Sequence, residues 1–253
     1  MKIGHCTHPR RDIVGELRWI GEHGFEFADL FLEPEADADR IDAGSISKAL
    51  KDYRLDAVGH TAWYLPVGSD MRDLRQAAVG ILKKYVLICA KLGCRLMTVH
   101  ANWPSPLFNA EEGIVFQTES FQQLCPFAKD NGVTIIYEPV STPKDSEKNI
   151  RKILDLNPLL GFHADIGHLN LYGRNPVDYL TAFKDRLMHI HLHDNDGQRD
   201  LHLPMGTGVI DWDILIKTLK SIYDGTITLE IFSKDKDYVL LSQKKLKERW
   251  ENA

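Results

Sequence analysis

The sequence predicts an α/β protein that folds as a single (β/α)8 barrel of the TIM type over residues 1–253. Eight short apolar or β-branched runs alternate with longer amphipathic stretches, which is typical of repeated βα units around a parallel sheet. Glycine stands just before four of these runs, and an ionisable residue lies at or near the end of nearly every one. Barrels of this kind ordinarily need about 250 residues, so one domain accounts for the chain of 253.

The eight runs are the predicted strands, and the predicted helices lie between them. The strands cover 2–6, 25–32, 55–60, 95–100, 133–138, 160–165, 187–193 and 226–231. Apolar residues recur every three or four positions between the strands, most clearly over 74–92, where Leu74 and Ile81 fall on the apolar face. A closing helix is expected over 234–250. Four glycines are predicted to end helices in the left-handed conformation: Gly24, Gly93, Gly132 and Gly225.

The composition is that of a globular protein able to bury a full core, with 43% hydrophobic and 26% charged residues. The net charge of −5 argues against a broad nucleic-acid footprint, because phosphate binding draws on clustered Lys and Arg, although a local basic groove stays open. No run approaches the roughly 18 apolar residues of a membrane span, and the N-terminus lacks the apolar core of a signal peptide. Four cysteines without CxxC spacing are expected to be reduced thiols in a cytoplasmic protein. A homo-oligomer stays open.

Ionisable side chains end the predicted strands, where a buried parallel strand would ordinarily carry apolar residues. All strands of a parallel barrel end on the same face, so residues that are far apart in the sequence meet in one pocket. The strand-end residues are His60, His100, Glu138, Asp165, His191 and Glu230, and the loops that follow add His168, Asp200 and His202.

Such a cluster predicts a divalent metal ion. Carboxylates and imidazoles gathered in a partly buried pocket repel one another and lose hydration, whereas a divalent cation neutralises them and accepts mixed nitrogen and oxygen ligands. Each residue alone is more often a hydrogen-bonded or surface group, and recurrence at strand ends is what favours ligation. The predicted ligand set is Glu138, Asp165, His191 and Glu230.

Other histidines are placed outside this set. His163 and His189 each precede one of the ligands by two residues, so the period of a strand turns them inward but deeper, and a hydrogen-bonded core role is predicted for both. His193 faces the same way and is expected to be able to touch substrate, while His5 and His8 are expected near the mouth of the first strand.

Five ordered motifs resemble the xylose-isomerase-like superfamily, which contains sugar and sugar-phosphate isomerases and epimerases together with endonuclease IV. The resemblance spans almost the whole chain and is specific for the superfamily rather than for one reaction. The motifs are Thr98-Val-His100, Tyr137-Glu138-Pro139, Asp165-Ile-Gly-His168-Leu-Asn, His191-Leu-His-Asp194-Asn and His202-Leu-Pro-Met-Gly206-Thr-Gly208-Val-Ile-Asp211-Trp.

The resemblance to single-metal ketose epimerases implies one divalent ion, manganese, magnesium or cobalt, on the same four ligands. It implies that Glu138 and Glu230 are catalytic and move a proton to and from the carbon beside the substrate carbonyl through a cis-enediolate. This is reasonable chemistry, because a metal that chelates the carbonyl and its neighbouring hydroxyl acidifies the C–H bond, and a carboxylate on either face supplies base and acid.

Further residues are expected to contact a small polyhydroxy carbonyl substrate, free or phosphorylated. His168 and Arg199 would hydrogen-bond its hydroxyl groups, and His60 and His100 belong to the same mouth. Two tryptophans, each three residues after a strand-end histidine, would wall a sugar ring or would pack as loop residues over the barrel. They are Trp63 and Trp103.

Endonuclease IV offers a rival interpretation, a zinc-dependent phosphodiesterase with three metals. The first ion would take His60, His100 and Glu138, the second would share Glu138 with Asp165, His191 and Glu230, and the third would take His168, Asp200 and His202. Clustered zinc ions suit phosphodiester hydrolysis. The acidic balance, the lack of an Arg/Lys-rich stripe and the loop His100-Ala-Asn-Trp-Pro, which departs from the His-Pro-Gly run of endonuclease IV, favour the isomerase.

Two further alternatives remain. A non-catalytic sugar-binding barrel is a third class of function, although both carboxylates of the proposed catalysis are present. Gly206 and Gly208 form a turn with Asp211 as the cap of the next helix, or their backbone N–H groups cradle a substrate phosphate, and the turn is the preferred interpretation.

Overall fold

The computed structural model describes residues 1–33 and 41–253, and its centre is a closed barrel of eight parallel strands in chain order. The barrel closes because β1 pairs with both β2 and β8. The strands are β1 (Lys2–Cys6), β2 (Phe27–Leu32), β3 (Asp56–Thr61), β4 (Leu96–His100), β5 (Thr134–Glu138), β6 (Gly161–Asp165), β7 (Leu187–Leu192) and β8 (Thr226–Leu229). The predicted (β/α)8 barrel is confirmed, and no strand end differs from its predicted position by more than two residues.

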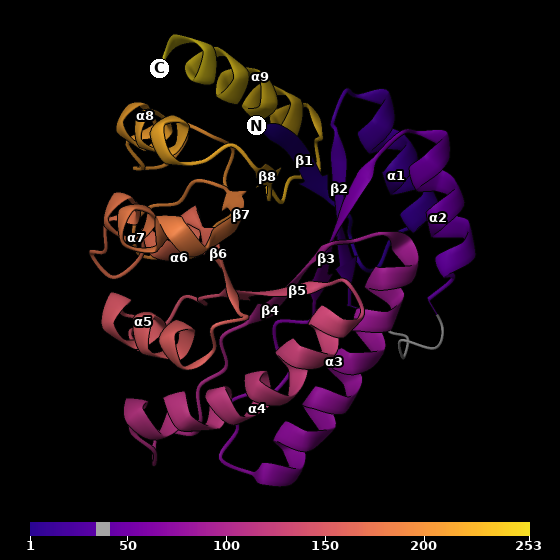
Figure 1. The fold of residues 1–253 in the computed structure, drawn as a ribbon. Helices are drawn as coiled ribbons and strands as arrows, with labels where there is room; N and C mark the ends of the chain where they lie inside the picture. Colours follow the sequence, from indigo (N-terminus) through magenta and orange to yellow (C-terminus); the bar gives the residue numbers. More distant parts are fainter. Residues whose placement is uncertain (34–40) are drawn as a thin grey trace.

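Helices form an outer layer around the strands (Figure 1). They are α1 (Ile13–Glu22), α2 (Ala43–Asp52), α3 (Arg72–Leu92), α4 (Ala110–Asp130), α5 (Glu147–Leu156), α6 (Ile166–Leu169), α7 (Pro176–Phe183), the 3-10 turn η2 (Lys184–Arg186), α8 (Trp212–Ile222) and α9 (Asp237–Asn252). The closing helix expected over 234–250 is observed as α9. No helix in residues 1–33 and 41–253 combines the length and apolar character needed to cross a bilayer.

Polar caps fix where several helices begin, because the first turn of a helix has unpaired N–H groups. Asp12 accepts the N–H groups of two residues in the first turn of α1. Asn109 and Glu112 form a reciprocal capping box at the start of α4. Asp211 caps α8, as predicted. These caps place the βα loops, and with them the loop residues of the barrel mouth.

Three of the four glycine predictions are confirmed. Gly24, Gly93 and Gly132 have φ angles of 73°, 80° and 74°, in the left-handed region that favours glycine. The prediction for Gly225 is wrong, because its φ lies outside that region and α8 ends at Tyr223 in an extended conformation. The Tyr223 hydroxyl lies against Gly225, so a side chain at this position would displace the ring.

The buried face of α3 includes Ala78, Leu82, Tyr85 and Leu92, which share the apolar face predicted from the sequence, but it is rotated away from two other predicted positions. Leu74 and Ile81 are 44% and 40% exposed, whereas Val79 and Val86 are buried. Because α3 contacts β3 and β4 below and α2 and α4 on either side, its buried stripe is set by four neighbours rather than by the apolar pattern alone.

The barrel interior is polar in its middle. Apolar side chains such as Leu17, Leu82 and Ile153 fill the layer between strands and helices, with no exposed surface. Inside the barrel, Asp29 on β2 and His189 on β7 are equally buried. A buried charge needs hydrogen-bonded partners. The partners of these two residues therefore have to be sought among the other side chains inside the barrel.

Candidate metal centre

The strand-end residues of the sequence come together at one mouth of the barrel. Register brings two pairs side by side, since His100 is the β-partner of Glu138 and Asp165 is the β-partner of His191. Glu230 directly follows β8. Neighbouring strands lie about 4.8 Å apart, so paired residues that face inward present their side-chain tips to a common point.

Glu138 is the centre of a first group. Its Oε2 lies 3.2 Å from Nε2 of His60 and 3.1 Å from Nε2 of His100, and these two nitrogens are 3.2 Å apart. Nδ1 of His163 approaches the same oxygen at 3.3 Å. Two imidazoles and a carboxylate therefore aim three donor atoms at one point.

A second group contains the other three predicted ligands. Glu138, Asp165 and His191 each offer a donor atom within 4.8 Å of those of the other two. Nδ1 of His191 is 3.0 Å from Glu230 Oε2 and 3.8 Å from Asp165 Oδ2. Asp165 and Glu230 meet the same 4.8 Å criterion together with His193. Asp165 and His191 thus lie close to both glutamates.

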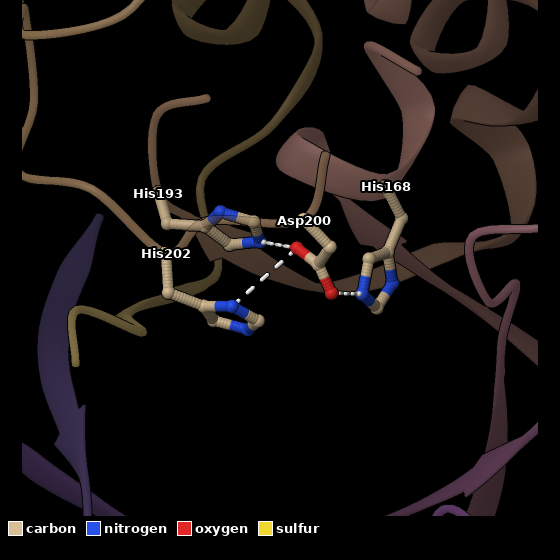
Figure 2. A group of neighbouring side chains, drawn as sticks. All are labelled: His168, His193, Asp200 and His202. Atoms are coloured by element: carbon tan, nitrogen blue, oxygen red, sulfur yellow. Dashed lines mark hydrogen bonds and ion pairs between the residues drawn. The ribbon is translucent and has the colours of Figure 1, made fainter. Parts of the chain in front are cut away.

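A third group surrounds Asp200 (Figure 2). One of its oxygens lies 3.1 Å from Nε2 of His168, and the other lies 3.6 Å from Nε2 of His193 and 3.4 Å from Nδ1 of His202. His168 donates from Nδ1 to the carbonyl of Pro139 at 3.0 Å, which directs Nε2 toward Asp200. His202 has a φ of 47°, a conformation that is strained for a residue with a side chain.

Electrostatics keep these groups charged in spite of burial. Burial alone would raise the pKa of Glu138, but the charges of His100 and His163 and hydrogen bonds from His100 and His60 outweigh it and hold that pKa well below its usual range. Burial alone would lower the pKa of His191, but Glu230 and Asp29 raise it well above its usual value. The centre thus gathers opposite charges on side chains that are largely buried.

The donor set fits a divalent ion. Tetrahedral coordination with bonds of 2.0–2.1 Å requires ligand atoms about 3.3 Å apart, and the distances within the first and third groups, 3.1 to 3.6 Å, are of that size. Oδ2 of Asp165 is buried without a hydrogen-bond partner in the described residues, although it faces His168 and His191 at 3.8 Å. A buried carboxylate oxygen without a partner is costly, and a cation would satisfy it.

The centre opens into a cavity of about 890 Å³, within the range of small-ligand sites. Both proposed catalytic glutamates line it, and so do the two predicted tryptophans. Trp63 is 62% exposed, whereas Trp103 is partly buried and donates from Nε1 to Asp145 at 2.9 Å. A ring-sized ligand therefore has room beside the predicted metal ligands.

A family model described as xylose isomerase-like TIM barrel matches residues 17–250. The chain belongs to this family. The superfamily resemblance read from the five motifs is confirmed by this match.

Relatives of the xylose isomerase-like chain include enzymes of two kinds. Fructoselysine 3-epimerase of Escherichia coli O157:H7 is 25% identical over 254 residues, which cover 91% of this chain and 90% of the relative. Probable endonuclease 4 of Thermotoga petrophila is 27% identical over 190 residues, 64% of each chain. A solved structure of a D-tagatose 3-epimerase-like protein superposes with a TM-score of 0.91 at 23% identity, covering 99% of this chain and 97% of the other.

Arg199 was predicted to contact substrate, but its side chain does not lie at the mouth of the barrel. Its guanidinium pairs with Asp196 through Nε at 2.9 Å and Nη2 at 2.8 Å, and its side chain is 72% exposed. It is absent from the described residues that line the cavity. The acidic neighbour three residues earlier captures the arginine locally, which the spacing from His191 did not reveal.

Asp29 is the main site residue that the motifs missed. Its Oδ2 lies 2.7 Å from Nε2 of His191 and 3.2 Å from Nε2 of His189, and it accepts a hydrogen bond from Thr228 at 3.0 Å. Burial would raise its pKa, but these imidazoles hold the pKa of Asp29 well below its usual range. The available signal was an aspartate inside an apolar strand, where a parallel barrel has no place for an unpaired charge.

The remaining histidines behave as predicted in part. His163 and His189 are fully buried and hydrogen-bonded, His163 to Thr98 and His189 to Thr226, as expected of core residues. His193 is 1% exposed and lies 3.0 Å from Asp165, so it is a deeper member of the centre than expected.

The loop that contains Gly206 and Gly208 is a turn held by hydrogen bonds to the buried side chain of Asp194. Asp194 accepts the N–H groups of Gly206 at 2.9 Å and Ile210 at 3.3 Å, and the Nε1–H of Trp212 at 2.8 Å. A side chain on Gly208 would overlap the carbonyl of Asn195. The preferred turn interpretation is confirmed, because an internal carboxylate already takes the N–H of Gly206.

Proposed function

We propose that residues 1–253 form one catalytic domain that acts as a metal-dependent isomerase or epimerase of a small polyhydroxy carbonyl compound. The observation that carries the proposal is the placement of two buried carboxylates, Glu138 and Glu230, each close to the same pair of predicted ligands, Asp165 and His191. Both glutamates line one cavity that has space for a sugar. The epimerases among the relatives support the same class of reaction.

The chemistry follows from the two glutamates. A divalent ion held by Glu138, Asp165, His191 and Glu230 would supply Lewis-acid activation of the carbonyl and its neighbouring hydroxyl. One glutamate then accepts the proton from the carbon beside the carbonyl, which leaves a cis-enediolate of the substrate. The other glutamate must enter the turnover protonated, and it gives that proton to the opposite face of the same carbon for epimerisation. His168 lines the cavity, which supports its expected contact with a substrate hydroxyl, and its Nε2 would exchange Asp200 for that hydroxyl.

Proton transfer gives the direct test. Wild-type protein supplied with Mn²⁺ should exchange a substrate C–H hydrogen with deuterated water for at least one member of a panel of ketoses, as followed by NMR. Glu230→Gln should lower that exchange by at least 100-fold, because a general base or acid contributes about 10² to 10⁴. Glu248→Gln, on the exposed surface of α9, is the matched control. Silence across the whole panel, or full activity of Glu230→Gln, would overturn the proposal.

A second candidate function rests on the third group. Nine predicted donors are arranged as three neighbouring groups, which is what a three-zinc phosphodiesterase requires. Elemental analysis after gentle purification separates the two candidates. One ion per chain supports the isomerase, whereas three zinc ions together with cleavage of DNA that carries an abasic site would support the endonuclease.

A further inference from the structure

The cavity continues beyond the metal centre into an arm of different character. The residues that define this arm are Arg11 from the loop after β1, Glu16 from α1, and Lys234 and Lys236 from the loop after β8. Because the second loop begins directly after Glu230, the arm is continuous with the proposed active site.

Charge distinguishes the two ends of the cavity. The arm carries three cationic side chains against one carboxylate, Glu16, which leaves a net formal charge of +2. The other acidic residues that line the cavity lie by the histidines of the centre: Glu33, Glu138, Asp200 and Glu230. A neutral polyol needs no such separation of charge, whereas a ligand with one anionic end would be oriented by it.

Glu16 anchors the cations rather than cancelling them. It is 8% exposed, and its Oε1 lies 2.9 Å from Lys236 Nζ and 3.7 Å from Arg11 Nη1. Lys236 Nζ also lies 4.1 Å from the ring centre of Trp19. Two cations on one buried carboxylate leave donor groups of the guanidinium available, and Lys234 adds a third positive side chain to the lining of the cavity.

The loop that contains Gly206 and Gly208 is a less suitable place for an anion. In many barrels the late loops bind phosphate through backbone N–H groups, but here the buried carboxylate of Asp194 takes the N–H groups of Gly206 and Ile210 and would repel an anion beside it. Among the described residues that line the cavity, the arm therefore provides the cationic groups.

We propose that the substrate carries an anionic group, a phosphate or a carboxylate, at the end remote from its carbonyl, and that Arg11 and Lys234 bind this group beside Lys236. This inference rests on the proposed function for the reacting end of the substrate. It places the discrimination between free and acidic sugars in the loops after β1 and β8.

Matched substrates test the proposal. The C–H exchange assay is run on a ketose, its terminal phosphate ester and its terminal carboxylic acid. We expect one anionic member to exceed the neutral one at least tenfold in kcat/KM, and the phosphate and carboxylate members show which anion is bound. In Arg11→Gln/Lys234→Gln this ratio should fall to near one, whereas Lys217→Gln on the outer face of α8 should keep it. Lys236 is left unchanged because it neutralises buried Glu16. A neutral ketose that is the best substrate, or a ratio unchanged in the double variant, overturns the proposal.

A binding experiment separates failure of this inference from failure of the proposed function. Inorganic phosphate and malonate are titrated into the holoprotein, with tryptophan fluorescence as the signal because Trp19 lies under Lys236. We expect saturable binding that is at least tenfold weaker in the double variant and unchanged in Lys217→Gln. This outcome with no exchange on any ketose would retain the anion site and reject the isomerase. Exchange on neutral ketoses with no difference in anion binding between wild type and double variant would reject the anion site and retain the isomerase.

Discussion

Replacing Asp29 by asparagine should weaken metal binding without unfolding the barrel. Oδ2 of Asp29 holds Nε2 of His191 at 2.7 Å, which leaves Nδ1 of that ring to face Glu230 and Asp165. A carboxylate behind a ligating imidazole fixes the ring and raises its basicity. The amide of asparagine keeps the shape and one acceptor but loses the charge, so the ring is held by a weaker, neutral hydrogen bond.

The size of the effect follows from that exchange of bonds. A hydrogen bond to a charged group contributes about 1.5–3 kcal/mol and a neutral one about 0.5–1.5 kcal/mol, so the loss is roughly 1–2 kcal/mol for the His191 contact. His189 shares the same oxygen at 3.2 Å and adds to it. At 1.4 kcal/mol for each factor of ten, we expect about a 5- to 30-fold rise in the Kd for the metal, which overlaps the range of about 10- to 100-fold for other such partners.

The assay is titration of metal-free protein with Co²⁺, followed by its visible absorption, and competition with a chelator for Zn²⁺. Measurements belong well above the ordinary pKa of imidazole, because loss of Asp29 also eases deprotonation of His191, which by itself would favour the metal. Asp56→Asn, exposed at the start of β3, is the matched control. A folded Asp29→Asn protein with wild-type affinity and an unchanged Co²⁺ spectrum would refute the positioning role.

Three further predictions test other parts of the molecule. Burial lowers the pKa of His5 to about 4, so as the pH falls the unfolded chain binds the proton first. The free energy of unfolding should therefore fall by up to about 3 kcal/mol between pH 6.5 and 4. In urea unfolding, His5→Asn, which can keep a hydrogen-bond donor to the carbonyl of Leu229, should lose this part of the pH dependence. Gly167→Ala should cost about 1–3 kcal/mol in the same assay, because a Cβ there overlaps the ring of His193; equal stability would contradict that packing. Arg199→Gln should leave kcat/KM on a responsive ketose within twofold, since its guanidinium pairs with Asp196; a larger loss would restore its predicted contact with substrate.

The fold and the strand-borne part of the site were predictable because both depend on short-range pattern. A strand has a period of two, so one ionisable residue at its end indicates which side chains face inward. Closure of a parallel barrel then brings the ends of all strands to one mouth. Residues such as Glu138 and Asp165 therefore needed no tertiary information. The same reasoning applies to Asp29, which is a charged residue in the middle of the second predicted strand rather than at its end.

Loop residues were harder, because a loop side chain chooses among partners that the sequence does not order. Arg199 lies after β7 as expected, yet Asp196 is close enough to capture its guanidinium. The rotated face of α3 and the extended end of α8 at Tyr223 have the same origin, since packing against neighbours overrides a local preference.

The centre and the arm of the cavity therefore differ in how freely they can change. The donors of the centre are set by register: Asp165 pairs with His191, and a slip of one residue in β7 would turn that imidazole away from the mouth. Any sequence that closes this barrel with these strands also builds the centre. Arg11 and Lys234 stand on loops, where exchange of a side chain leaves the sheet intact. The proposed reaction thus depends on residues that the register of the strands sets, and the proposed choice of substrate depends on the two loops that contribute Arg11 and Lys234.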